Sequence, residues 1–308
     1  MAVPILWQDP FSSDRRPLFI PKYFSSLGED EKFILKEDLE KHGINEDFSN
    51  TIFDYAKFLK VLDLWNLDNK VGRWIAFKLS LAKVNHIINL LIKLFIESGA
   101  TLHKLDLNFP VWIELKPVIF YVLEENKQFF SRIQHLCLGK KISDNHIGSA
   151  ATLLKALAKS TTKISTIELQ WFESICKPQL LHALINVIKS QEQLRLFFLD
   201  GDYGGYPTEF YGIISALESQ KNSLQEVILD HCDFSAEFEV LNKCKNLETL
   251  RIRNCTTRLL KLLDYKVSTL YVVDFQNYAM PLIFEKSGKL LQRLILELNG
   301  EFGKFRDE

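Results

Sequence analysis

One short pattern of apolar residues recurs along the chain and limits what it can fold into. Each copy has apolar residues at its first, fourth and sixth positions, with polar or variable residues between them. The copies begin at Leu102, Ile133, Ile164, Leu194, Leu224, Leu247, Val267 and Leu291, and a plausible earlier copy begins at Leu59. Successive copies from Leu102 onward are separated by 31, 31, 30, 30, 23, 20 and 24 residues. Leucine is common, so a single copy means little, but eight copies at such intervals are not expected by chance.

This spacing is the signature of a leucine-rich repeat, whose period is typically about 20 to 29 residues. The apolar alternation within each copy predicts a short strand. Helical periodicity predicts helices over 110–129, 143–159, 177–190 and 207–220, and only one or two helical turns between the later copies. We therefore predict an α/β leucine-rich-repeat solenoid, with a curved parallel sheet and helices on its convex side.

The solenoid is predicted to cover residues 57–308, with a long helical pair or a single helix over 71–98 that caps the first repeat. Residues 1–56 do not fit the repeat. Within them a charged helix is predicted over 29–42, because its first turn is acidic. Three prolines between positions 8 and 21 indicate an extended linker.

Composition excludes some functional classes. The chain has 38 Lys and Arg against 39 Asp and Glu, which argues against a nucleic-acid binder because such proteins normally carry a basic excess. No apolar run reaches the roughly 18 residues of a membrane helix, so no membrane partner is predicted. The first residues do not form a signal peptide. We expect a cytoplasmic location, leaving a nuclear one open, and free thiols at the five cysteines.

No motif in the sequence indicates an enzyme. The glycine-rich segment 201–205 lacks the Lys-Ser/Thr pair of a phosphate-binding loop and fits a turn after a strand. A zinc site could be proposed from His231, Cys232, Cys244 and Cys255, but the cysteines lie 12 and 11 residues apart, without the close ligand pairs of structural zinc. Cys232 and Cys255, like Asn299, instead occupy the repeat position whose side chain turns inward and bonds the backbone. We predict no catalytic residue, no metal ligand and no cofactor.

Residues 2–11, with the sequence Ala-Val-Pro-Ile-Leu-Trp-Gln-Asp-Pro-Phe, resemble the end of the F-box in fungal F-box/leucine-rich-repeat proteins. Phe53-Asp54-Tyr55 and the following Phe58-Leu59 are similar to the linker of that family into its first strand. In the family, the F-box is a short helical module that docks on the Skp adaptor of a cullin ubiquitin ligase. The resemblance implies that residues 1–56 are the end of an F-box plus a linker. Most of the F-box would lie before Met1, so the adaptor is expected to bind only if that module is restored.

The outward positions of the strands form the predicted binding surface, because a solenoid presents its strands on a concave face. Several of these positions carry aromatic side chains and arginines, the types that dominate binding hot spots. The candidate partner-binding residues are Phe198, Asp200, Ile228, Asp230, Arg251, Arg253 and Tyr271. In a second interpretation, Asp230 and Arg253 form only a surface ion pair, and a terminal segment covers Phe198 and Tyr271.

These observations favour a protein-interaction module that binds a protein partner on its concave face. With the resemblance, the hypothesis becomes the substrate-recognition part of an F-box/leucine-rich-repeat ubiquitin ligase receptor. The alternative hypothesis is a stand-alone leucine-rich-repeat scaffold or inhibitor with no link to ubiquitin.

Overall fold

The computed structural model describes most of the chain. The described residues are 3–13, 17–49, 51–110, 112–139, 144–172, 178–201, 210–263, 266–275, 279–287 and 289–298. They belong to two compact units. The first unit comprises Met1–Cys137 with Ile142–Thr161, and the second comprises Leu138–Lys141 with Thr162–Glu308.

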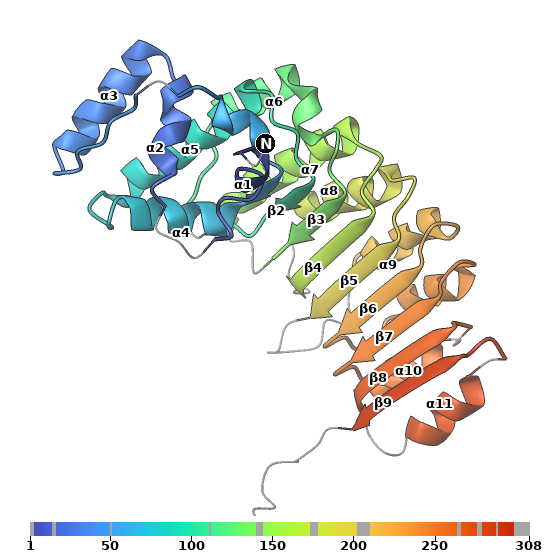
Figure 1. Ribbon diagram of the computed structural model, residues 1–308. Coiled ribbons are helices and arrows are strands. Elements are labelled where there is room, and N and C mark those ends of the chain that lie inside the picture. Colours follow the sequence, from blue (N-terminus) through green and yellow to red (C-terminus); the bar gives the residue numbers. More distant parts are fainter. Residues whose placement is uncertain are drawn as a thin grey trace, which may run out of the picture. The chain divides into compact units, whose positions relative to one another are not determined.

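Helices and short strands alternate in the first unit (Figure 1). In chain order its elements are α1 Val3–Leu6, α2 Ile20–Tyr23, η1 Phe24–Ser26, α3 Glu29–Glu40, η2 Tyr55–Phe58, β1 Val61–Asp63, α4 Leu64–Trp74, α5 Leu81–Glu97, β2 Lys104–Asp106, α6 Pro117–Glu125, η3 Lys127–Phe130, β3 His135–Leu138, η4 Asp144–His146 and α7 Ile147–Ser160. Strand β1 pairs with β2, and β2 pairs with β3, in both cases in parallel.

The second unit repeats the same alternation with shorter helices (Figure 1). Its elements are β4 Thr166–Phe172, α8 Pro178–Ser190, β5 Leu196–Gly201, α9 Ile213–Ala216, η5 Leu217–Gln220, β6 Glu226–Asp230, η6 Ala236–Lys243, β7 Thr249–Arg253, α10 Thr257–Leu262, β8 Thr269–Phe275, α11 Met280–Lys286 and β9 Arg293–Leu298. From β4 to β9, each strand pairs in parallel with the next strand along the chain. In each unit the helices lie on one face of the sheet (Figure 1).

The predicted α/β leucine-rich-repeat solenoid is confirmed by this topology. Each strand from β1 to β9 begins two residues after the first apolar residue of its copy of the repeat. In the copy that contains β6, Leu224, Val227 and Leu229 are all almost completely buried. The alternation of apolar and polar residues therefore directs one side of each strand into the core between sheet and helices.

The sequence left open whether 71–98 forms a helical pair or a single helix, and the structure has the pair, α4 and α5. The two helices are separate because Ala76 and Phe77 adopt the left-handed backbone region with φ of 51° and 55°. Gly72 makes room for this turn, since a Cβ there would lie 2.7 Å from the Phe77 ring. The predicted helix over 110–129 is shortened to α6, which starts at Pro117, a residue suited to the first turn.

The prediction of an extended linker between positions 8 and 21 is wrong for the described residues there. Phe11 is buried, and Trp7, just before the segment, stacks on Tyr55 with ring centroids 4.0 Å apart. Tyr23, just after it, meets Phe95 of α5 edge to face at 5.0 Å. Prolines indicate irregular backbone, but here the aromatic side chains between and beside them pack onto the first unit.

The predicted structural role of the repeat cysteines is confirmed. The Cys232 thiol donates to the Asp230 carbonyl at 3.2 Å, and the Cys255 thiol donates to the Arg253 carbonyl at 3.1 Å. Burial raises the pKa of the Cys232 thiol, which keeps it protonated as a donor. The third residue in this repeat position, Asn299, lies outside the described residues, as does Cys176.

None of the described helices is both long enough and sufficiently apolar to cross a membrane.

We predict that Leu250→Ala destabilises the second unit by about 2–5 kcal/mol. Leu250 on β7 is 1% exposed and lies between Val227 of β6 and Leu270 of β8. Urea unfolding measures the change. Arg251→Ala, on the outward side of the same strand, is the matched control and should cost less than about 1 kcal/mol. If Leu250→Ala lowered the free energy of unfolding by less than about 1 kcal/mol, the assignment of Leu250 to the core would be contradicted.

Asp106 on β2 provides a pH-dependent prediction. Burial and the neighbouring carboxylate of Asp63 raise the pKa of Asp106 to about 6. The folded state therefore favours the protonated carboxyl of Asp106. The stabilisation that this protonation provides is lost as the pH rises through about 6. Asp106→Asn should raise the free energy of unfolding at pH 8 by roughly 1–3 kcal/mol and flatten its dependence between pH 4 and 7. Asp47→Asn, at an exposed position of the same unit, should change neither quantity; equal pH profiles for wild type and Asp106→Asn would refute the assignment.

Candidate binding surface on the second unit

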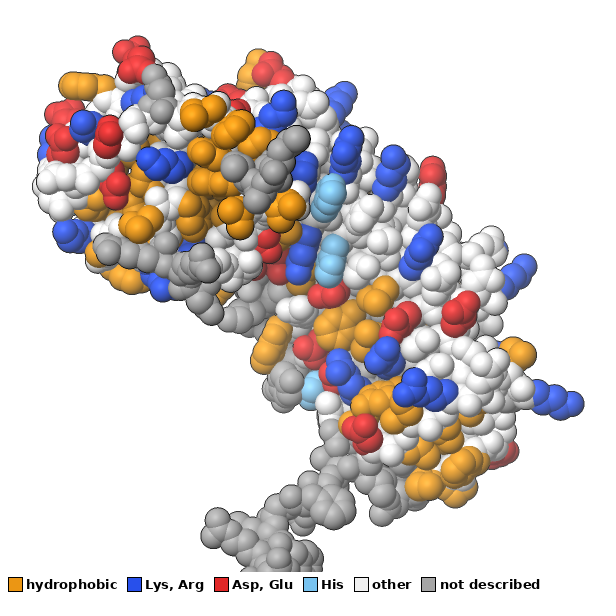
Figure 2. Space-filling view, in the orientation of Figure 1, with side chains coloured by type: hydrophobic (Ala, Val, Ile, Leu, Met, Phe, Trp, Pro, Cys, Tyr) orange, Lys and Arg blue, Asp and Glu red, His pale blue; other side chains and the backbone are white. Residues whose placement is uncertain are grey.

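The seven candidate partner-binding residues lie together on four adjacent strands. We call this set the strand surface, and it comprises Phe198, Asp200, Ile228, Asp230, Arg251, Arg253 and Tyr271. Strand register aligns it in two rows: Phe198, Ile228, Arg251 and Tyr271 form one, and Asp200, Asp230 and Arg253 form the other. None of the seven is fully buried, and Figure 2 shows hydrophobic, basic and acidic side chains intermixed over these strands.

Arg253 connects three of the strands. Its Nε lies 3.1 Å from Oδ2 of Asp230, on the neighbouring strand β6. Its guanidinium carbon also lies 6.0 Å from the centre of the Phe198 ring on β5, at the outer range of a cation–π contact. The ion pair between Asp230 and Arg253, which the second interpretation predicted, is therefore present. The same arginine also lies over the Phe198 ring of the surface.

Two glutamates at outward strand positions, which are not among the seven candidates, complete the surface. Arg251 Nε lies 2.7 Å from Oε1 of Glu226, one strand away, and the Tyr271 hydroxyl donates to Oε1 of Glu297 at 2.9 Å. Both glutamates stand at outward positions of neighbouring copies. The repeat pattern therefore places both glutamates on this face, whereas their contacts with Arg251 and Tyr271 come only from the structure.

A histidine joins the carboxyl end of the surface. His231 Nδ1 lies 3.0 Å from Oδ1 of Asp230 and 3.3 Å from Oδ1 of Asp200. Asn254 donates to the same Asp230 oxygen at 2.9 Å. Burial raises the pKa of Asp200, and the charge of Asp230 adds to this effect. The contact of His231 with the two aspartates was not predicted from the sequence, because His231 was considered there only as a zinc ligand together with cysteines.

These groups could hold a metal ion only by rearrangement. Ligand atoms of Asp200, Asp230 and His231 lie within 4.8 Å of one another. However, Asp230 already faces the Arg253 guanidinium and the Asn254 amide. A divalent cation would have to displace or repel that arginine, so the arrangement favours an internal polar network over a metal centre.

Two segments near the predicted site lie outside the described residues. These are most of the glycine-rich segment 201–205, namely 202–205, and the terminal residues 299–308. In the described part of the chain, Phe198 and Tyr271 are half-buried within the sheet face and lie in one row with Arg251. The surface therefore combines aromatic, apolar and charged groups suited to contact with a protein.

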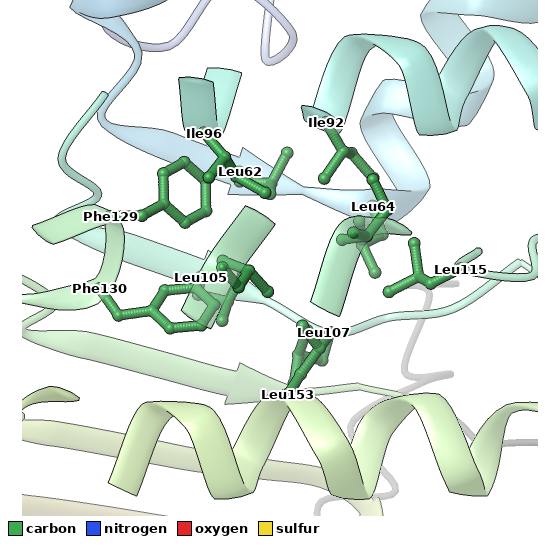
Figure 3. Close-up of a pocket in the computed structure, with 12 residues that line it drawn as sticks. Leu62, Leu64, Ile92, Ile96, Leu105, Leu107, Leu115, Phe129, Phe130 and Leu153 are labelled. Carbon is green, nitrogen blue, oxygen red and sulfur yellow. The ribbon is translucent and has the colours of Figure 1, made fainter. Parts of the chain in front are cut away.

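The first unit contains an apolar cavity of about 20 Å³ beneath its strands (Figure 3). Its walls are the side chains Leu62, Leu64, Ile92, Ile96, Leu105, Leu107, Leu115, Ile119, Leu123, Phe129, Phe130 and Leu153. The space could contain one water molecule but offers no polar side chain to bind it. We interpret it as a packing defect of the core and not as a ligand site.

Comparison with known proteins adds one similar solved structure. No protein-family model matches the chain, and no curated protein matches it. Among solved structures it is similar to the leucine-rich repeat-containing protein LegL7 from Legionella pneumophila, at 15% sequence identity and a TM-score of 0.40. The similarity covers 79% of this chain and 83% of that one. The fold of the present chain is assigned from its own strand order and repeat spacing.

Proposed function

We propose that this chain is a protein-interaction module whose strand surface binds a protein partner, and that it acts as the substrate-recognition part of an F-box/leucine-rich-repeat ubiquitin ligase receptor. The single observation that carries the binding proposal is the row Phe198, Ile228, Arg251 and Tyr271, aligned across β5 to β8. An aromatic ring, an aliphatic side chain, an arginine and a tyrosine in one row have the composition of a binding hot spot.

The partial pairing of the arginines also supports binding. Arg251 remains 46% exposed while it contacts Glu226, so its outer donors can still reach a partner. Arginine already oriented by such a contact loses less conformational freedom on binding than a mobile one. Acidic and basic groups alternate on the surface, which favours a partner of mixed charge over a uniformly charged one.

The ubiquitin ligase part of the proposal rests on the resemblance of residues 2–11. The packing and the exposure of side chains in this segment support it. Trp7 is held in an aromatic cluster with Tyr55, while Ile5 and Leu6 on α1 are 68% and 72% exposed. Apolar side chains at this point would be covered by the helices of an F-box.

The strand surface itself favours the alternative of a stand-alone scaffold or inhibitor. All of its residues belong to the second unit, and their contacts are formed within that unit. Partner binding there requires no adaptor and no residue from 1–56.

We expect the double variant Phe198→Ala with Arg251→Ala to bind its partner at least about tenfold more weakly, because it removes two hot-spot side chains. The measurement is a titration of wild type and variant with a partner captured by the wild-type chain and then purified. The matched control is Gln179→Ala with Lys189→Ala, on the exposed side of α8. Thermal unfolding should remain close to that of the wild type, and unchanged affinity would place the binding site elsewhere.

The ligase role requires its own test. An in-frame helical segment with Leu-Pro near its start is expected upstream of the codon for Met1. A protein that includes this segment should co-purify with the Skp adaptor, whereas the 308-residue chain should bind it poorly. Failure of the longer protein to co-purify would contradict the ligase role and leave the stand-alone alternative.

A further inference from the structure

The first unit carries a separate cluster of cationic side chains at the amino ends of its strands. We call it the basic cluster, and it comprises Lys60, His103, Lys104 and Arg132. Lys60 precedes β1, His103 and Lys104 stand at the start of β2, and Arg132 lies before β3. Figure 2 shows basic and histidine side chains gathered near β2 and β3.

Backbone pairing fixes the spacing of these residues. The Lys60 carbonyl accepts from the amides of His103 and Lys104, at 2.7 and 3.1 Å. In the next strand pair, the His103 carbonyl accepts from the amides of Gln134 and His135, at 2.9 and 3.1 Å. The Lys60 ammonium is further anchored, since it donates to the Thr101 carbonyl at 3.1 Å and to its hydroxyl at 2.6 Å. Lys60, His103 and Lys104 are therefore held on a rigid frame.

The cations of the cluster repel one another. Burial and the charge of Arg132 lower the pKa of Lys60. Burial, Lys60 and Arg132 lower the pKa of His103. Within the described part of the chain, neither Lys60 nor Arg132 takes part in an ion pair with a carboxylate. An anion bound here would relieve repulsion that the fold leaves uncompensated.

We propose that the basic cluster docks a short acidic segment of a protein partner, as a second contact surface distinct from the strand surface. Three adjacent strand starts span about 10 Å. Alternate carboxylates of an extended peptide lie roughly 7 Å apart, so two or three of them match this width. Charge complementarity thus defines the occupant as a run of Asp or Glu side chains.

Two aspartates beside the basic cluster limit the length of an acidic ligand that can bind there. Asp63 follows three residues after Lys60 on β1, and Asp106 follows two residues after Lys104 on β2. These two aspartates pair across the strands, so an acidic row lies beside the basic one. A nucleic acid bound along the face would bring phosphates against these carboxylates. Nucleic-acid binding also commonly uses about 6–10 phosphate contacts, more than this cluster offers. The observations therefore favour a short protein segment over a polynucleotide.

Binding of a fluorescein-labelled hexaglutamate peptide to the full chain tests the proposal. We expect it to bind at least about tenfold more tightly than a hexaserine peptide at 50 mM NaCl, and to weaken at 300 mM NaCl because salt screens exposed charges. Lys104→Glu with Arg132→Glu should reduce the affinity at least about tenfold. The milder double variant Lys104→Gln with Arg132→Gln should give an intermediate loss of affinity. Circular dichroism of both variants checks that the loss does not come from misfolding.

The matched control is Lys127→Glu with Lys155→Glu, which makes the same charge change at exposed positions of η3 and α7 in the same unit. This control should keep its affinity within about twofold. Equal losses in both charge-reversal variants, or no preference over hexaserine, would overturn the proposal. Tighter binding of a thymidine hexanucleotide through the same residues would overturn it in favour of nucleic acid. The Phe198→Ala with Arg251→Ala variant should bind hexaglutamate normally, so this proposal and the proposed function can fail independently.

Discussion

Lateral burial of one repeat against the next is the constraint on which the rest of the structure depends. A strand of three to seven residues with one short helix cannot cover its own apolar side. Val227, Leu250 and Leu270 show how the problem is solved, because they are paired across β6, β7 and β8 and are all essentially inaccessible to solvent. The parallel register is therefore kept from β6 to β8, since a shift of one residue would turn these side chains out of the core.

The same register builds the outer surface. When the inward residues align, the residues between them must also align, on the opposite side of the sheet. Arg253 can then contact Asp230 on the next strand and Phe198 two strands away, although these residues lie far apart in sequence. A binding surface of this kind needs no loop to shape it, because the frame that buries the core also orders its side chains.

The near-zero net charge hides an uneven distribution of charge. The second unit presents acids and bases in contact with one another, as in the pairs of Arg251 with Glu226 and Arg253 with Asp230. The first unit also contains ion pairs, such as Lys93 with Glu31, but its basic cluster is different. There, burial and the charge of Arg132 lower the pKa of Lys60, and burial, Lys60 and Arg132 lower the pKa of His103. Two surfaces of different chemistry on one chain would allow a partner to be recognised by both apolar and acidic features.

The sequence by itself determined the repeat, the start of each strand and the alternation of inward and outward residues, because a period of two and a near-regular spacing depend only on local geometry. It also predicted the inward turn of Cys232 and Cys255. Tertiary structure alone decided which side chains meet across strands, as with His231 between two aspartates, because that depends on rotamers and reach. It also decided between a helical pair and a single helix over 71–98, through the left-handed turn at Ala76 and Phe77. Long-range aromatic contacts decided the packing of Phe11, since they outweigh what the prolines indicate locally.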